Sequence, residues 1–189
     1  MRIVAGDLRG RTLVAPKGHS TRPTADRTRQ ALFNVLEHAA WGPGVKGVRV
    51  ADLFAGSGSL GLEALSRGAA HGLFVDSDPA AIAAIGDNLA TLKLLDRASV
   101  RRLDATRLAP MGSGDAPFDL VFLDPPYAKG LAEPALAALR SGRWLAGDAF
   151  VVVERGTEEA ELAAPGFEVL DSRSWGAARV WFMRPEPAG

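Results

Sequence analysis

From residue 47 onward, short β-type runs alternate with amphipathic runs of helical period, and this alternation restricts the fold more than any other feature of the chain. The expected strands are 48–54, 73–75, 98–102, 118–123, 150–153, 167–171 and 180–183. The expected helices are 60–67, a helix that follows Asp78, and 131–139. Strands that alternate with helices form a parallel sheet with helices on both faces, so the pattern predicts an α/β fold. Ligands of such sheets bind beyond the carboxyl ends of the strands.

Two helices have recognisable start signals. One is expected to begin at Thr24 as its N-cap, with Asp26 in its first turn. The other has Asp78 as its expected N-cap and Pro79 at its first position. The residues expected to face the core are Leu32, Val35, Leu36 and Ala39 in the first helix and Ile82, Ile85, Leu89 and Leu92 in the second.

Length and the N-terminal pattern predict the domain organisation. A chain of 189 residues accommodates about one domain. Residues 2–5 and 11–14 are extended stretches joined by a turn with glycine at both ends, which predicts a β-hairpin. We therefore expect a basic β-hairpin extension over residues 1–20, one α/β domain over 21–185 and a flexible tail over 186–189.

The net charge of zero conceals an uneven distribution. The first 30 residues hold seven Lys or Arg and two Asp, whereas the other residues hold fifteen Lys or Arg and twenty Asp or Glu. A basic N-terminal arm on an acidic body indicates contact with a polyanion, although a merely solvated charged surface has the same composition. The residues expected to bind RNA phosphates are Arg2, Arg9, Arg11, Lys17 and Arg22. Arg27 and Arg29 are left out, because a structural ion pair within their helix explains them equally well.

Several classes of protein are excluded by composition. The chain has no cysteine, so it has no disulfide, thiolate zinc site or iron–sulfur cluster, and its three histidines are too far apart to suggest a metal centre. The first ten residues carry charges where a signal peptide needs an apolar stretch, and no later run reaches the ~18 apolar residues of a membrane span. We expect a cytoplasmic protein that binds neither metal nor membrane.

A nucleoside site is predicted at the first strand of the sheet. That strand runs into a glycine loop over 52–61 that opens directly into a helix, and such a loop lets the backbone approach a nucleoside closely. Asp76 follows Asp52 by 24 residues, at the end of the second strand, where a carboxylate can accept both hydroxyl hydrogens of a ribose. Turn chemistry alone would explain the glycines but not their register with the strand, the helix and the acid.

The glycine spacing by itself fits a dinucleotide as well as S-adenosylmethionine. Asp52 favours S-adenosylmethionine, because a carboxylate there attracts a cationic amino group and repels a pyrophosphate. Asp104 and Ala105 follow the third strand and offer an acceptor for an adenine amine, although a solvated loop would look the same. The helix at Thr24 can close over the cofactor, and a minimal dinucleotide fold has no such helix.

The fourth expected strand ends in Asp124-Pro125-Pro126-Tyr127, which we interpret as the catalytic motif. The prolines fix the backbone, so that the Asp124 carboxylate and the Pro125 carbonyl can both accept hydrogen bonds from one amine. Tyr127 offers a flat face on which a flipped base can stack. The alternative is a proline-rich loop with an Asx turn.

Together these motifs resemble the amino-methyltransferases, and most closely the RsmD-type family, which methylates guanine N2 in bacterial small-subunit (16S) ribosomal RNA. The resemblance covers nearly the whole chain. It is carried by the N-terminal glycine turn, Arg22-Pro23-Thr24, Arg27, Arg29, Phe33-Asn34, the glycine loop, Asp76, Asp104, the Asp-Pro-Pro-Tyr motif and Val153-Glu154-Arg155.

The resemblance implies a Rossmann-like, seven-stranded methyltransferase domain whose last strand is antiparallel. It also implies that the substrate is ribosomal RNA in an assembling small subunit, and we expect the enzyme to be a monomer. With the argument from spacing, the expected cofactor residues are Thr24, Asp52, Gly56, Ser57, Gly58, Asp76, Ser77, Asp104 and Ala105. Two positions depart from the family pattern: Asp76 replaces a longer Glu, and Trp175-Gly176 replaces a Tyr-Gly pair.

The identity of Asp124 predicts the target base. Guanine presents two neighbouring donors on its Watson–Crick edge, whereas adenine presents an amine beside an acceptor. An ionised Asp124 offers only acceptors and therefore matches guanine N2. Three rival functions remain at this point: an amino-methyltransferase for another RNA, DNA or a small molecule, a dinucleotide-dependent oxidoreductase, and an RNA-binding assembly factor without activity.

Overall fold

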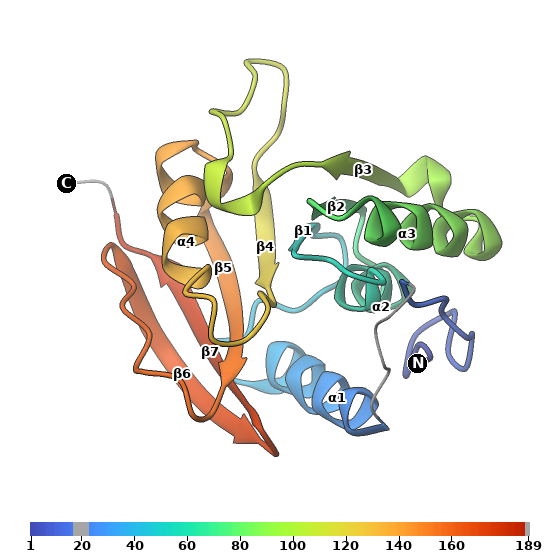
Figure 1. Ribbon diagram of the computed structural model, residues 1–189, viewed down its shortest axis with the longest axis horizontal. Helices are drawn as coiled ribbons and strands as arrows, with labels where there is room; N and C mark the ends of the chain where they lie inside the picture. The colour runs from blue at the N-terminus through green and yellow to red at the C-terminus, as the bar shows by residue number, and fades with distance from the viewer. Residues whose placement is uncertain (17–22, 188–189) are drawn as a thin grey trace.

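The computed structural model describes residues 1–16 and 23–187, and a seven-stranded sheet forms its centre (Figure 1). The strands are β1 (Arg49–Leu53), β2 (His71–Asp76), β3 (Ala98–Arg102), β4 (Phe118–Leu123), β5 (Leu145–Gly156), β6 (Phe167–Trp175) and β7 (Ala178–Pro185), in the spatial order β3-β2-β1-β4-β5-β7-β6. Strand β7 is antiparallel to both of its neighbours, β5 and β6, and the other strands run in one direction. The predicted α/β fold and its antiparallel last strand are confirmed.

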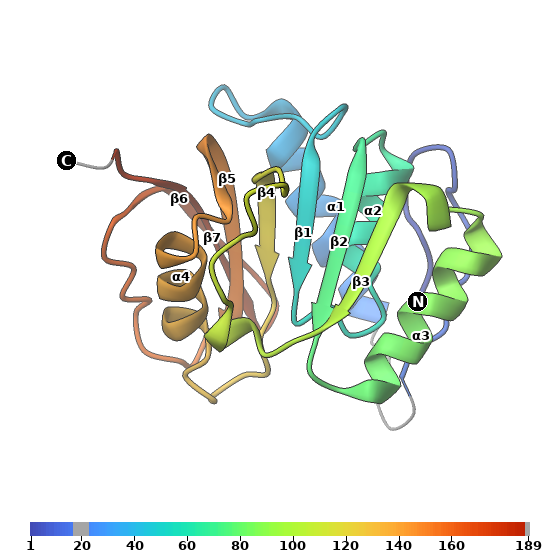
Figure 2. The same ribbon diagram turned by 90° about the horizontal axis from the view of Figure 1, so that it is seen from above.

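Helices cover both faces of this sheet (Figure 2). They are α1 (Pro23–His38), α2 (Ser59–Ser66), α3 (Pro79–Leu92) and α4 (Ala132–Ser141), with short 3-10 turns η1 (Leu95–Arg97) and η2 (Ala105–Arg107). One hydrophobic cluster joins α1, α2 and α3 to the sheet, and a second joins α4 to the opposite face. Within the described residues, no helix is long and apolar enough to cross a membrane.

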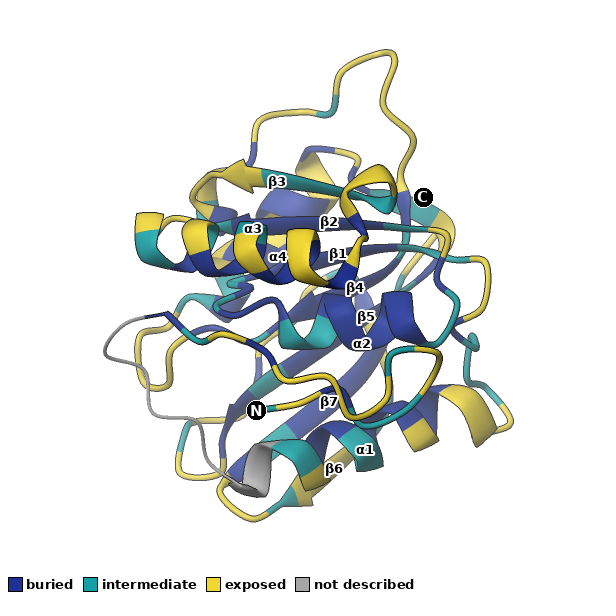
Figure 3. Cartoon of the chain, turned by 90° about the vertical axis from the view of Figure 1, so that its right-hand side faces the viewer, coloured by how far each residue is buried: buried dark blue, intermediate teal, exposed yellow. Residues whose placement is uncertain are grey.

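The central strands are buried on both faces, as expected for a parallel sheet between two helical layers. In β1 and β4 nearly every residue is buried, whereas the edge strand β3 is partly exposed along its length. Figure 3 shows the same contrast between the buried strands and the exposed outer side of α3. The near-continuous apolar runs of the sequence thus correspond to the strands that position the site.

Three sequence expectations about the helices need correction. Helix α1 begins at Pro23, so Thr24 lies inside its first turn and is not the N-cap, and Ala39 lies just beyond its end. Proline is favourable there because the first helical N–H has no partner within the helix. Ile82 is only half-buried, because the inner face of α3 is formed by Ala81, Ala84, Ile85, Asn88, Leu89 and Leu92. The predicted cap at Asp78 is confirmed, since its carboxylate accepts a hydrogen bond from the Ala80 amide.

The N-terminal segment turns back on itself as expected, but it does not form two strands. An isolated antiparallel bridge joins Arg2 to Thr12, and the amide of Ile3 donates to the Arg11 carbonyl at 2.9 Å. The ladder goes no further because α2 takes the neighbouring donors: the amides of Val4 and Ala5 donate to the Glu63 carboxylate at 2.8 and 3.0 Å. The segment is therefore held by α2 as well as by its own turn.

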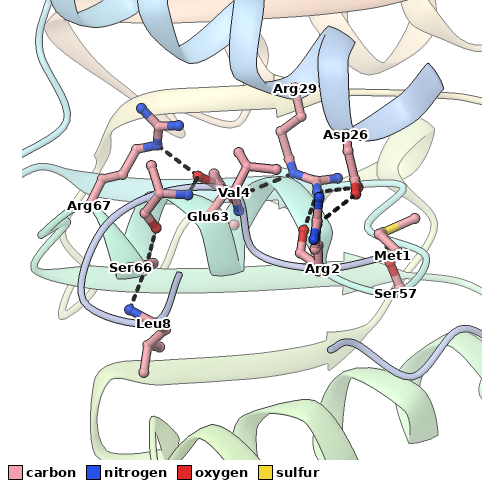
Figure 4. Close-up of polar contacts among 12 residues, drawn as sticks. Met1, Arg2, Val4, Leu8, Asp26, Arg29, Ser57, Glu63, Ser66 and Arg67 are labelled. Atoms are coloured by element: carbon pink, nitrogen blue, oxygen red, sulfur yellow. Dashed lines mark hydrogen bonds and ion pairs between the residues drawn. The ribbon is translucent and has the colours of Figure 1, made fainter. Parts of the chain in front are cut away.

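A buried charge network fixes this segment against α1 and α2 (Figure 4). The Glu63 carboxylate on α2 has no exposed surface and accepts hydrogen bonds from the amides of Val4 and Ala5 at 2.8 and 3.0 Å. It also accepts from Arg67 Nε at 2.8 Å and lies 3.5 Å from Arg29 Nε on α1. Arg29 in turn donates to the Arg2 carbonyl and pairs with Asp26 at 2.8 Å.

Replacing Glu63 should destabilise the protein strongly. Glu63→Ala removes one of the two carboxylate partners of Arg29 and of Arg67 and leaves the amides of Val4 and Ala5 without their acceptor, and breaking a buried pair in this way costs about 3–5 kcal/mol. Glu161→Ala is the matched control, because its pair with Arg179 is exposed and surface pairs contribute about 0–1 kcal/mol. Urea unfolding measures both variants. Equal losses of unfolding free energy in the two would contradict this account of the network.

Candidate active site

Four carboxylates lie side by side at the carboxyl ends of adjacent strands. In spatial order they are Asp76 on β2, Asp52 on β1, Asp124 after β4 and Glu154 on β5. The register pairs Val75, Leu53, Leu123 and Val153 across the four strands. The other carboxylates follow this row of paired residues by one residue, whereas Asp52 precedes it by one residue. Because successive side chains of a strand point to opposite faces, the four belong to the same face, which α1, α2 and α3 cover.

Asp52 is the most deeply buried member of this row. Its carboxylate accepts a hydrogen bond from the Gly61 amide at 2.8 Å. Burial raises the pKa of Asp52 to about 8, against the lowering effect of the Gly61 hydrogen bond and with a smaller raising effect from the Asp76 charge. Among the described residues, no cation lies within ion-pair distance of Asp52, Asp76, Asp124 or Glu154.

The glycine loop between β1 and α2 is shaped by close packing. A side chain at Gly61 would put its Cβ 2.4 Å from the Phe74 ring, so only glycine lets α2 approach the sheet this closely. Gly58, with φ of 78°, makes the left-handed turn into α2. Phe54 has φ of 62°, which is unusual for an aromatic residue and marks strained backbone beside the row of carboxylates.

Asp76 holds the same loop in place. Its two carboxylate oxygens accept hydrogen bonds from the amides of Gly56 and Asp78, each at 2.9 Å. Ser77, between Asp76 and Asp78 in the sequence, is exposed. The expected ribose acceptor is thus at the expected strand end, and part of its hydrogen-bonding capacity fixes the loop.

The other expected cofactor residues lie in more varied surroundings. Asp104 is exposed and accepts hydrogen bonds from the Thr106 hydroxyl and amide, which lower the pKa of Asp104, and Ala105 beside it is buried. Ser57 is buried, and its hydroxyl donates to the Met1 sulfur at 3.4 Å. The side chain of Thr24 is outside the part of the chain that the structure describes.

The Asp-Pro-Pro-Tyr motif leaves the carboxyl end of β4 in the middle of the row. The phenol of Tyr127 donates a hydrogen bond to Glu154 at 2.7 Å, while its side chain is 40% exposed. Burial, followed by the charges of Glu154 and Asp52, raises the pKa of Asp124 well above its ordinary value. Pro125 is buried, Pro126 is exposed, and the backbone then turns sharply at Ala128, where φ is 58°.

A cavity of 180 Å³ opens over the motif. Asp124, Tyr127 and Glu154 line one side of it. Thr28 and Arg29 of α1 line another side, and Trp175 and Ala178 from the last hairpin close it. The volume is below the ~300–1,000 Å³ typical of sites for whole drug-sized ligands, and suits the flat part of a ligand rather than all of it.

The basic residues expected to bind RNA are not equally accessible. The side chain of Arg2 is 69% exposed and lies 3.7 Å from Asp26, and Arg9 is exposed. Arg11 is exposed and donates to the Thr91 carbonyl at 3.4 Å. Lys17 and Arg22 lie outside the described residues.

Glu154 is the site residue to which the sequence analysis gave no role. The signal for it was present, since it follows the apolar run Phe150 to Val153 just as Asp124 follows the run of β4. Arg155, next to it, lies on the opposite face of the sheet: it pairs with Glu133 of α4 at 2.7 Å and with Glu159 at 3.2 Å.

A second, smaller cavity of 90 Å³ lies at the amino ends of the strands, away from the row of four carboxylates.

Comparison with known proteins shows which family the chain belongs to. Residues 1–184 match the family model described as Conserved hypothetical protein 95. The chain belongs to this family. It is similar to Ribosomal RNA small subunit methyltransferase D of Escherichia coli (strain K12), with 38% identity over 165 residues that make up 87% of this chain and 79% of the relative.

Other relatives agree with this assignment. YlbH of Bacillus subtilis (strain 168) is 43% identical over 159 residues, which cover 84% of each protein. The solved structure of the Escherichia coli protein yhhF superposes with a TM-score of 0.82 at 33% identity, over 98% of each chain. The resemblance to the RsmD-type methyltransferases inferred from the sequence is therefore confirmed.

Asp52 should make the stability of the protein depend on pH. Its pKa is about 8 in the folded state and near 3.8 when exposed, so the folded state binds a proton that the unfolded state releases between these values. Stability due to this group therefore falls as pH rises from about 4 to about 8. Asp52→Asn keeps an acceptor for Gly61 without the charge, and should be more stable than the wild type above about pH 7 by more than about 1 kcal/mol, or about 2–4 °C in Tm.

Thermal unfolding at several pH values, without any ligand, tests this expectation. Asp148→Asn is the control, because Asp148 is exposed and its substitution should leave the pH profile unchanged. A constant difference in Tm between Asp52→Asn and the wild type from about pH 5 to about pH 8 would show that Asp52 is not the titrating group.

Proposed function

We propose that this protein is an S-adenosylmethionine-dependent methyltransferase that modifies N2 of a guanine in small-subunit ribosomal RNA. The observation that carries the proposal is the row of four carboxylates beside a cavity lined by Tyr127, at the ligand-binding edge of a parallel sheet. The relatives named as ribosomal RNA methyltransferases support the same reaction and substrate class.

The residues of this edge fit a cationic nucleoside. Buried carboxylates without a cationic partner are costly, and a positively charged ligand relieves that cost. A dinucleotide would instead bring its pyrophosphate against Asp52 and Asp76, which disfavours the oxidoreductase alternative. Asp52, Asp76 with Ser77, Asp104 with Ala105, and the loop from Gly56 to Gly58 would hold S-adenosylmethionine, which supplies a methyl group activated by a positive sulfur.

The catalytic contribution of the protein is mainly orientation. Asp124 and the Pro125 carbonyl would accept hydrogen bonds from the amine and hold its lone pair toward the methyl group. Tyr127 would stack on the flipped base, and base stacking of this kind contributes about 1–3 kcal/mol. Direct transfer to the amine then needs no covalent intermediate with the enzyme.

The N-terminal basic arm would bind the RNA backbone. Arg2 and Arg9 are exposed on the segment that also contributes Met1 to the cavity wall, so phosphates bound there would lie next to the base pocket. Such contacts position RNA without reading its sequence. We further propose that the enzyme works as a monomer in the cytoplasm on RNA in an assembling small subunit, with 1–20 as the arm and 21–185 as the catalytic domain.

Cofactor binding and methyl transfer should separate by mutation. Asp76→Ala should weaken S-adenosylmethionine binding, because it removes the ribose acceptor and releases the amides of Gly56 and Asp78. Asp124→Ala should leave cofactor affinity within about twofold and abolish turnover. Calorimetry and transfer of a labelled methyl group to ribosomal RNA from a methylation-deficient strain measure the two effects. Wild-type turnover by Asp124→Ala would refute the assignment of the catalytic motif.

The product should be N2-methylguanosine. An ionised Asp124 can accept from both N1–H and the N2 amine of guanine, whereas facing adenine it would oppose an acceptor, at a cost of about 1–3 kcal/mol. Asp124→Asn should therefore methylate guanine much more slowly. Mass spectrometry of the nucleosides from digested RNA identifies the product. If the wild type produced N6-methyladenosine, the protein would still be a methyltransferase, but the assignment of guanine as its target would be wrong.

A further inference from the structure

Glu154 lies beside the proposed catalytic carboxylate in the sheet. Leu123 of β4 and Val153 of β5 are paired in the sheet register, so the next residues, Asp124 and Glu154, lie at the same level on neighbouring strands. Adjacent strands are about 4.8 Å apart. Both side chains line the 180 Å³ cavity, and the Tyr127 phenol donates to Glu154 at 2.7 Å.

The other charges around Asp124 do not neutralise Glu154. Asp52 approaches Asp124 from β1, and it brings no positive charge and has only a minor effect on the pKa of Asp124. Arg29 of α1 lines the same cavity, but its guanidinium pairs with Asp26 and Glu63. The side chains of Met1 and Thr28 on this wall carry no charge, and within the described residues the Met1 amino group forms no ion pair with Glu154 or Asp124. Burial raises the pKa of Glu154 and the Tyr127 hydrogen bond opposes that rise, so Glu154 is the member of the pair whose charge has a donor. A charged Glu154 at close range favours protonation of Asp124.

We propose that Glu154 is a positioning residue for methyl transfer, which acts through Tyr127 and Asp124. Its carboxylate holds the Tyr127 ring at the cavity wall, and its negative charge keeps Asp124 basic enough to take the proton that the amine releases. This role rests on the proposed function, and it concerns a residue that touches neither the methyl group nor the amine.

The proton must leave the amine for the reaction to finish. The lone pair of the guanine N2 nitrogen forms the new bond to the methyl carbon, while the carbon–sulfur bond breaks and its electron pair stays on sulfur. The nitrogen is then positively charged, and one N–H bond breaks with its electrons returning to nitrogen and its proton passing to Asp124. A more basic Asp124 accepts this proton more readily, and both burial and Glu154 raise the pKa of Asp124.

Glu154→Gln separates the charge from the contact. Glutamine keeps an acceptor for the Tyr127 phenol and nearly the same shape, but it has no negative charge. In methyl transfer to ribosomal RNA, kcat should fall about tenfold while the KM for RNA stays within about twofold. The acidic limb of the pH–rate profile should also move to lower pH, because Asp124 loses a neighbouring charge. Glu158→Gln is the matched control, since Glu158 is exposed on the next turn of chain and should behave as the wild type.

A second measurement needs neither cofactor nor RNA. Carbon NMR of ¹³C-labelled aspartate carboxyls follows the titration of Asp124, with Asp124→Asn used to assign its signal. The apparent pKa of Asp124 should drop by at least about half a unit in Glu154→Gln and remain unchanged in Glu158→Gln. An unchanged titration in Glu154→Gln overturns the role of Glu154, even if the variant is a slow enzyme. A wild-type protein that transfers no methyl group to any RNA would instead refute the proposed function, and the titration still decides how Glu154 acts on Asp124.

Discussion

The burial of Glu63 is the interaction on which the rest of the site depends. A carboxylate with no exposed surface must be surrounded by donors, and here they come from the N-terminal segment, α1 and α2 itself. The network sets where α1 and the N-terminal segment lie on the sheet, and these two carry Met1, Thr28 and Arg29 to the cavity wall. A structural ion network therefore shapes the cavity through Arg29, which belongs to the network and also lines the cavity.

Much of the fold could be predicted from the sequence, because the information is local. Apolar runs with β-branched residues identified β1, β4 and the core of β5, and the cap at Asp78 identified the start of α3. The glycine loop, Asp76 and the Asp-Pro-Pro-Tyr motif follow their strands directly, so the parallel order alone brings them to one edge. These positions depend on strand ends and not on details of packing.

What could not be predicted depends on contacts between distant residues. The N-terminal strands did not form because α2 binds their amides, and nothing in residues 2–14 indicates that Glu63 and Ser66 are the partners. The role of Glu154 appears only when the register places it beside Asp124. The sequence also did not indicate that Asp76, the expected ribose acceptor, accepts hydrogen bonds from the loop amides of Gly56 and Asp78. Burial and register are properties of the assembled sheet.

The reversed direction of β7 has a consequence for the order in which the protein becomes active. Because β7 runs against β5, its first residue, Ala178, lies beside Gly156 at the carboxyl edge, and the β6–β7 turn reaches the cavity. The pocket is thus enclosed by residues from both extremes of the chain, Met1 on one side and Ala178 on the other. Contacts of such wide sequence separation carry a high loop-closure cost and form late. A newly made chain therefore completes this cavity only when its last hairpin has paired.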